Sequence, residues 1–69
     1  MSLFDRYPEC RRVIVNLKTG TSFEGVLWRR RRGYLVLRDA KMLRPKGEVL
    51  TVDGEVVVDA ANVDWIQVT

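Results

Sequence analysis

The sequence predicts an all-β fold, a small and strongly bent five-stranded barrel with a short N-terminal helix. After residue 12 apolar residues recur with a period of two, and turn-forming residues separate the alternating stretches. The whole chain has 69 residues, enough for one domain, so we expect a single domain over residues 1–69. Short antiparallel strands joined by short connections can close at this size only by bending sharply.

A short helix is expected at the N-terminus, in the stretch "SLFDRYPECRRV". Ser2 is suited to the N-cap, and Asp5 lies three residues further on, as in a capping box. Pro8 either limits the first turn or restarts the helix as its first residue.

The alternating pattern places the five expected strands at residues 13–18, 21–29, 34–43, 55–59 and 63–68. Gly25 lies inside the second of them, where a glycine costs stability unless the sheet bends or another backbone approaches closely. We therefore expect a bend at Gly25. Residues 41–53 allow two interpretations, a long loop or a hairpin extension that turns at Pro45–Gly47.

Several apolar residues lie outside the main inward register of these strands. They are Ile14, Val26, Trp28, Val36, Val57 and Trp65. Since a bent sheet has one inner face, this second apolar surface needs another cover. Either the N-terminal helix, with Leu3, Phe4 and Tyr7, or a subunit interface would provide it.

The composition excludes several kinds of site. Cys10 is the only cysteine and there is no histidine, so we expect no intrachain disulfide, no zinc site and no cofactor. Without histidine the commonest general base is missing, and we do not expect an enzyme. A core this small is marginal, and oligomerisation is the remaining way to stabilise it.

Charge is distributed unevenly along the chain. Residues 1–32 carry eight Arg and Lys against three Asp and Glu, whereas residues 48–69 carry five acids and no base. The molecule should therefore have one basic and one acidic side. The lone thiol and the absence of a long apolar run or signal-peptide pattern favour a cytoplasmic protein.

Three stretches resemble the Sm/LSm family. They are "VIVNLKTGTSFEGVL" at 13–27, "YLVLRDA" at 34–40 and "GEVVVDAANVDWI" at 54–66. The resemblance implies a head-to-tail homo-oligomeric ring, a hexamer or heptamer, in which the fourth strand pairs with the fifth strand of a neighbour. The interface is expected to use residues of the last two strands, namely Val56, Val57, Val58, Val63, Trp65 and Ile66. In general appearance the sequence looks more like divergent Sm-like proteins, of the kind that some tailed phages encode, than like a housekeeping RNA chaperone, and for a phage protein a virion location is the alternative.

In this family the third and fifth loops line the pore and bind single-stranded RNA, commonly uridine-rich. The chain departs from the pattern at both loops. Tyr34 occupies the position of the family's base-reading Asn, and Asp59-Ala60 replaces Arg-Gly. An aspartate at that position repels phosphate, so we do not expect a standard uridine pocket.

The arginine run, Arg29, Arg30, Arg31 and Arg32, is the best candidate for a functional site. We expect Arg29–Gly33 to form a hairpin tip whose charge binds the phosphates of RNA or single-stranded DNA, with Tyr34 as a further contact. Trp28 and Tyr34, each taken alone, are typical of packing residues that seal an interface. A basic tip can also serve solubility only. The alternative function is a structural ring or adaptor within a larger protein assembly, such as a viral particle, with no nucleic-acid role.

Overall fold

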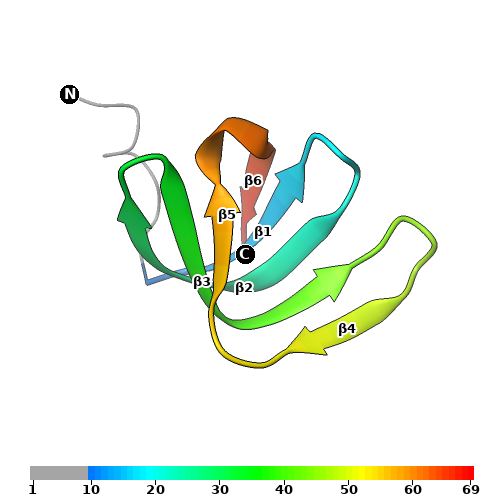
Figure 1. Ribbon diagram of the computed structural model, residues 1–69. Helices are drawn as coiled ribbons and strands as arrows, with labels where there is room; N and C mark the ends of the chain where they lie inside the picture. The colour runs from blue at the N-terminus through cyan, green and yellow to red at the C-terminus, as the bar shows by residue number, and fades with distance from the viewer. Residues whose placement is uncertain (1–9) are drawn as a thin grey trace.

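The computed structural model describes residues 10–69, which form six strands and one 3-10 turn (Figure 1). The elements in chain order are β1 (Arg12–Leu17), β2 (Ser22–Arg31), β3 (Tyr34–Leu43), β4 (Val49–Val52), β5 (Val56–Asp59), η2 (Ala60–Asn62) and β6 (Val63–Val68). Most of the predicted N-terminal helix lies outside the described residues. At its end, Cys10 and Arg11 form a turn and a bend, and β1 begins at Arg12.

All six strands belong to one antiparallel sheet, which confirms the predicted all-β class. The strand order is β4-β3-β2-β1-β6, and β5 pairs with β3 as well. The ten-residue β3 therefore has two partners along one edge, with Tyr34–Leu37 paired to β5 and Ala40–Leu43 paired to β4. Figure 1 shows how β2 and β3 curve so that β5 and β6 come to lie on the same side of the molecule.

The sheet bends at Gly25, as the sequence predicts. Glu24 pairs with Lys41 and Val26 with Arg38, so Gly25 faces two residues of β3, one of which is Asp39. Asp39 takes a left-handed conformation with φ of 51°, and its carboxylate accepts a hydrogen bond from the Arg12 guanidinium at 2.8 Å. This irregularity is a β-bulge, which bends and twists a strand locally.

Replacement of Gly25 by alanine should therefore destabilise the fold. An added Cβ would lie 2.9 Å from the Arg38 carbonyl oxygen and 3.1 Å from the Ala40 Cα, and both are backbone atoms that cannot turn aside. We expect a loss of about 1–3 kcal/mol in the free energy of unfolding, the usual cost of overpacking, measured by urea denaturation. An unchanged urea midpoint would show that β2 and β3 can move apart at Gly25 without a loss of stability.

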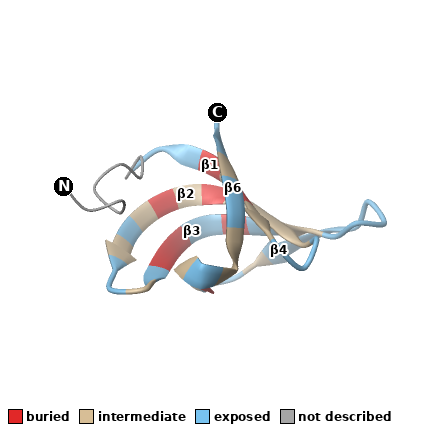
Figure 2. Cartoon of the chain, turned by 90° about the horizontal axis from the view of Figure 1, so that it is seen from above, coloured by how far each residue is buried: buried red, intermediate tan, exposed pale blue. Residues whose placement is uncertain are grey.

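The core lies on the inner face of this bent sheet, and its buried residues appear red in Figure 2. It is a single cluster of apolar side chains, formed by Val13, Val15, Leu27, Leu35, Leu37, Ala40 and Val58. Leu17 and Phe23 pack against the cluster while partly exposed. The inward register predicted for the first two strands is thus confirmed.

Residues 41–53 form the hairpin extension, the second of the two interpretations. β3 pairs with β4 from Ala40–Val52 to Leu43–Val49, and the Gly47 amide donates a hydrogen bond to the Arg44 carbonyl at 2.9 Å within the turn. The hairpin arm, residues 41–52, adds β4 to the five predicted strands and projects from the barrel (Figure 1). No helix between residues 10 and 69 is long and apolar enough to cross a membrane.

Candidate nucleic-acid interface

The arginine run continues strand β2 and does not form a loop. Arg29 pairs with Val36, Arg30 with Leu35 and Arg31 with Tyr34, which leaves only Arg32 and Gly33 in the turn. Gly33, the second residue of the turn, has a φ of 76°, a left-handed conformation that glycine adopts without steric cost. The predicted tip over Arg29–Gly33 is therefore wrong, because the backbone ladder extends two residues further than the charge run suggested.

The four arginines are distributed over two faces of the sheet. Arg29 and Arg31 are exposed on the outer face, opposite the core. Arg30 lies between them and is half-buried, and its cross-strand partner Leu35 belongs to the core. The run is thus two exposed side chains on the outer face, one partly buried side chain on the other face, and Arg32 in the turn.

The Arg32–Gly33 turn lies directly against the 3-10 turn η2. The Ala60 amide donates a hydrogen bond to the Gly33 carbonyl at 2.9 Å, and Tyr34 pairs with Asp59 in the β3–β5 ladder. These are the two loops that the Sm resemblance singles out, and both lie at the same end of the molecule (Figure 1). The Tyr34 side chain is exposed there.

Asp59 has a local structural role in this arrangement. It is the N-cap of η2, and its Oδ1 accepts a hydrogen bond from the Ala61 amide at 2.9 Å. A side chain that caps the turn satisfies an otherwise unpaired backbone donor. The residue that replaces the family's arginine is thus used to hold the loop.

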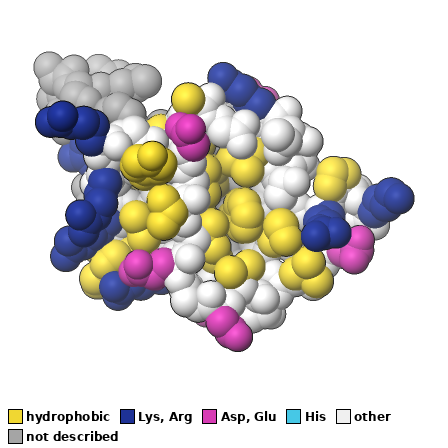
Figure 3. All heavy atoms as spheres, viewed as in Figure 1, with side chains coloured by type: hydrophobic (Ala, Val, Ile, Leu, Met, Phe, Trp, Pro, Cys, Tyr) yellow, Lys and Arg dark blue, Asp and Glu magenta, His cyan; other side chains and the backbone are white. Residues whose placement is uncertain are grey.

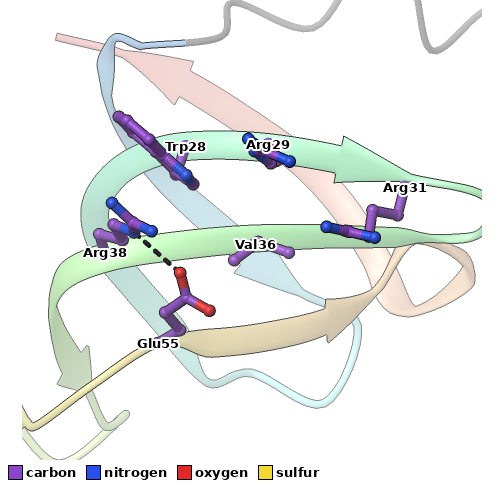
Figure 4. A pocket seen from close by; sticks show the side chains of 6 residues that line it. All are labelled: Trp28, Arg29, Arg31, Val36, Arg38 and Glu55. Atoms are coloured by element: carbon purple, nitrogen blue, oxygen red, sulfur yellow. Dashed lines mark hydrogen bonds and ion pairs between the residues drawn. The ribbon is translucent and has the colours of Figure 1, made fainter.

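A groove opens on the outer face of the sheet, with a volume of about 270 Å³. We call it the outer groove, and it is lined by Trp28, Arg29, Arg31, Val36, Arg38 and Glu55 (Figure 4). The Arg38 guanidinium carbon lies 4.0 Å from the centroid of the Trp28 ring, and Arg38 Nε donates a hydrogen bond to Glu55 Oε2 at 2.8 Å. Arg29 and Arg31 form no hydrogen bond or ion pair with the residues that the structure describes.

Sequence reasoning did not find Arg38 and Glu55 as parts of this surface. They are 17 residues apart, and only the pairing of Leu37 with Val56 brings them together. The alternation in "YLVLRD" places Val36 and Arg38 on one face, which was the one available signal. Between residues 10 and 69 no group of three or more Cys, Asp or Glu side chains could hold a metal ion.

The residues predicted for a subunit interface have different positions in the structure. Val57 and Trp65 expose 60% and 55% of their surface, whereas Val58 exposes 5% and belongs to the core. Val56, Val63 and Ile66 are partly buried against that core. Val58 is therefore unavailable as a side-chain contact, because its pairing with Leu35 directs it inward.

The outer edges of β5 and β6 pair with no strand among the described residues. Figure 3 shows apolar side chains gathered over the middle of the face where β5 and β6 lie, with Lys and Arg side chains around its periphery. Val57 and Trp65 thus lie on β5 and β6, the two strands whose outer edges are unpaired.

No protein-family model and no curated protein sequence matches this chain. Several solved structures are similar to this chain. An Sm protein of Pyrococcus abyssii, in complex with a uridine heptamer, has a TM-score of 0.81 and 32% identity, with 100% of each chain covered. A heptameric archaeal Sm protein has a TM-score of 0.75 and 28% identity, with 87% of each chain covered. The P. aerophilum SmAP1 heptamer has the same TM-score and identity, over 87% of this chain and 80% of that one.

The likeness to the Pyrococcus protein extends over the whole length of both chains, and it joins a shared fold to sequence identity. It also agrees with the three stretches of sequence and with the hydrogen bond that brings the β2–β3 turn against η2. The chain belongs to the Sm/LSm family.

Proposed function

We propose that this protein forms a closed ring and binds single-stranded RNA without catalysis, mainly through phosphate contacts of the arginine run. The observation that carries the proposal is the Ala60–Gly33 hydrogen bond, which places Arg32 and Tyr34 beside η2. Two of the similar Sm structures are heptamers, and the third holds a uridine heptamer.

The ring follows from the two open edges of the sheet. Exposed edge strands attract other strands, and a head-to-tail contact between different edges closes into a ring when the rotation permits. Pairing β5 of one copy with β6 of the next would satisfy both edges. It would also bury Val57 and Trp65, the two apolar side chains left exposed beside them.

Binding through phosphates fits the side chains at the β2–β3 end of the molecule. Arg29, Arg31 and Arg32 are exposed and have no partner between residues 10 and 69, so their charges are available to an anion. Tyr34 offers an exposed ring on which a base can stack. Neither it nor the capping Asp59 supplies the amide or guanidinium that would read a base edge, so binding should tolerate many sequences.

The salt dependence of binding tests this mode. Each phosphate contact with a single strand contributes about −0.7 to the slope of log K against log salt concentration. Contacts from the three exposed arginines of one subunit therefore predict a slope of roughly −2 or steeper. Fluorescence anisotropy of a labelled oligouridine, titrated from low to physiological salt, measures this slope, and a flat line would refute phosphate binding.

Native mass spectrometry at low salt tests the ring and its cargo together. We expect a closed oligomer that carries nucleic acid after purification and releases it in a high-salt wash. A monomer would contradict the ring. A ring without nucleic acid and without affinity for oligouridine would favour the structural alternative, for which the hairpin arm offers exposed Val49 and Leu50 as a protein contact.

A further inference from the structure

We propose that the hairpin arm joins two rings of this protein, with β4 of each subunit pairing antiparallel with β4 of a subunit in the second ring. The inference rests on the proposed function, because it takes the closed ring as its starting unit. It concerns a different surface, since the ring is proposed to close through β5 and β6, whereas β4 ends the sheet within the hairpin arm.

The outer edge of β4 is open and carries no protection against pairing. β4 pairs with β3 on one side, and no strand within residues 10–69 lies along its other side (Figure 1). Natural sheets commonly protect such an edge with lysine, proline or a β-bulge. The sequence of β4, VLTV, contains neither lysine nor proline, and its pairing with β3 has no register shift. This edge is therefore suited to the addition of another strand.

The hydrogen bonds of the arm determine which backbone groups the open edge offers. The Arg44 amide donates to the Glu48 carbonyl at 2.9 Å, so these two residues form a hydrogen-bonded pair. Hydrogen-bonded and non-hydrogen-bonded pairs alternate along an antiparallel ladder, and the register of β3 with β4 continues directly from this pair. Leu50 therefore bonds to β3, whereas the N–H and C=O groups of Val49 and Thr51 point to the open edge.

A two-fold axis at Thr51 gives two copies of β4 a favourable register. It places Thr51 opposite its own copy, and Leu50 of each copy opposite Val52 of the other. Two facing threonines are a stabilising cross-strand pair, and contact with Val52 removes the partly exposed Leu50 from water. Val49 lies opposite Asp53 at the two ends of the contact, where the carboxylate stays in water.

An axis at Leu50 would give a poorer contact. It would place Glu48 of each copy opposite Val52 of the other. Val52 pairs with the buried Ala40, so its side of the arm continues the face of the sheet that forms the core. A carboxylate on that face would lose water without gaining a partner. The axis at Thr51 is therefore the better one.

The charges of the arm favour a second copy of this chain over an unrelated strand. Because the two arms run antiparallel, the turn of each arm comes beside residues 53–55 of the other. The arm carries Arg44 and Lys46 at its turn, and the facing segment carries Asp53 and Glu55. Opposite charges on facing segments steer association and disfavour partners that lack them.

A ring makes this small contact effective. Two strands of four residues bury much less than the roughly 1,000 Å² that a stable interface needs. Rotation about the ring axis repeats the arm in every subunit, so two rings would meet through as many arm pairs as each ring has subunits. Linking such contacts raises the overall affinity by about 10²–10⁴-fold without any new kind of contact.

Pairing through the arms leaves the proposed RNA-binding end of each ring free. β3 begins at Tyr34, beside the Arg32–Gly33 turn, and ends at Leu43, where the arm turns back. The arm and the Arg32–Gly33 turn therefore extend from opposite ends of this strand. A double ring would carry two RNA-binding ends and hold two strands of RNA in one particle.

Native mass spectrometry of Thr51→Pro tests the contact. Proline removes the Thr51 N–H, which points to the open edge, and leaves the hydrogen bonds between β3 and β4 intact. We expect the subunit number of the wild type to be halved in Thr51→Pro, because a double ring separates into two single rings. The circular dichroism spectrum and the affinity for a short oligouridine should stay at the wild-type values.

The outcomes distinguish failure of the double ring from failure of the proposed function. An equal subunit number in the wild type and Thr51→Pro, with oligouridine bound by a closed ring, would overturn the arm contact and leave the proposed function standing. A single ring that retains another protein on its arm would also overturn it. A monomeric wild type would refute the ring, and the double ring with it.

Disulfide formation tests the register independently of the proline variant. In a Cys10→Ser background, Thr51→Cys and Val49→Cys each carry a single thiol. The two Thr51 Cα atoms would lie about 5.5 Å apart, within the usual disulfide range of about 4.4–6.8 Å. The two Val49 residues would be separated by about 13.6 Å along the strands, at about 3.4 Å per residue.

Diamide, which takes two electrons and two protons from a pair of thiols, should therefore convert Thr51→Cys into disulfide-linked dimers. The Val49→Cys control should remain unlinked under the same conditions, although Val49 is itself well exposed. Equal linkage of the two variants would reflect random collision and overturn the proposed pairing. Absence of linkage in both would overturn it as well.

Discussion

Replacement of Arg29, Arg31 and Arg32 together by serine is expected to weaken binding to single-stranded RNA by about a hundredfold or more at low salt, because phosphate contacts supply nearly all of sequence-independent binding. These three side chains are exposed and have no partner within residues 10–69. The variant leaves Arg30 unchanged, since that residue is partly buried and engaged in the fold. Anisotropy of labelled oligouridine measures the loss, and circular dichroism checks that the β-sheet remains.

The hairpin arm offers a charge-matched control. Lys41, Arg44 and Lys46 are also exposed, and their replacement by serine removes the same three charges, taking the formal net charge from +3 to 0 in both variants. We expect the arm variant to retain most of the affinity, because its charges lie away from the β2–β3 turn and η2. Equal losses in the two variants would mean that net charge governs binding and that the arginine run is no specific site.

The inner face of the sheet could be predicted from the sequence. Alternation with a period of two identifies Val13, Val15 and Leu27 as inward residues, because a strand with one buried face must alternate. Gly25 was equally informative, because a glycine inside a strand usually marks a bend or the close approach of another backbone. The backbone of Arg38 and Ala40 approaches Gly25 in this way.

The faces on which the arginines lie could not be predicted, because one inserted residue reverses the alternation beyond it. A regular β2 that continued past Trp28 would direct Arg30 outward, with Arg29 and Arg31 inward. The bulge at Trp28 reverses this, so that Arg29 and Arg31 lie in the outer groove and Arg30 faces the core side. No local sequence pattern marks the position of such a bulge.

The predicted interface included Val58, although the alternation that places Val57 outside the inward register also places its neighbour Val58 inside. The structure assigns Val57 to the outer face, paired with Val36, and Val58 to the core. This distinction matters for the proposed ring, since only an exposed side chain can be altered without disturbing the barrel itself.

Val57→Lys is accordingly expected to convert the ring to monomers. In the proposed ring Val57 lies beside the β5 edge that pairs with β6 of the neighbour, and 60% of its surface is exposed in the single chain. A lysine there would leave an unpaired charge in each contact, which costs about 3–5 kcal/mol when such a charge is buried without a partner. Because every subunit contributes the same residue, every contact of the ring is weakened. Native mass spectrometry at micromolar concentration reports the change in subunit number.

Val49→Lys is a closely matched control, because Val49 is a strand valine with 57% of its surface exposed but lies on the hairpin arm in β4. A lysine there introduces the same charge at the same exposure, away from the open β5 and β6 edges. We expect this variant to keep the wild-type ring, and both variants to keep the wild-type circular dichroism spectrum. If Val57→Lys remained a full ring, the β5 edge would not form the subunit contact. If instead Val49→Lys alone dissociated, the hairpin arm would hold the ring together.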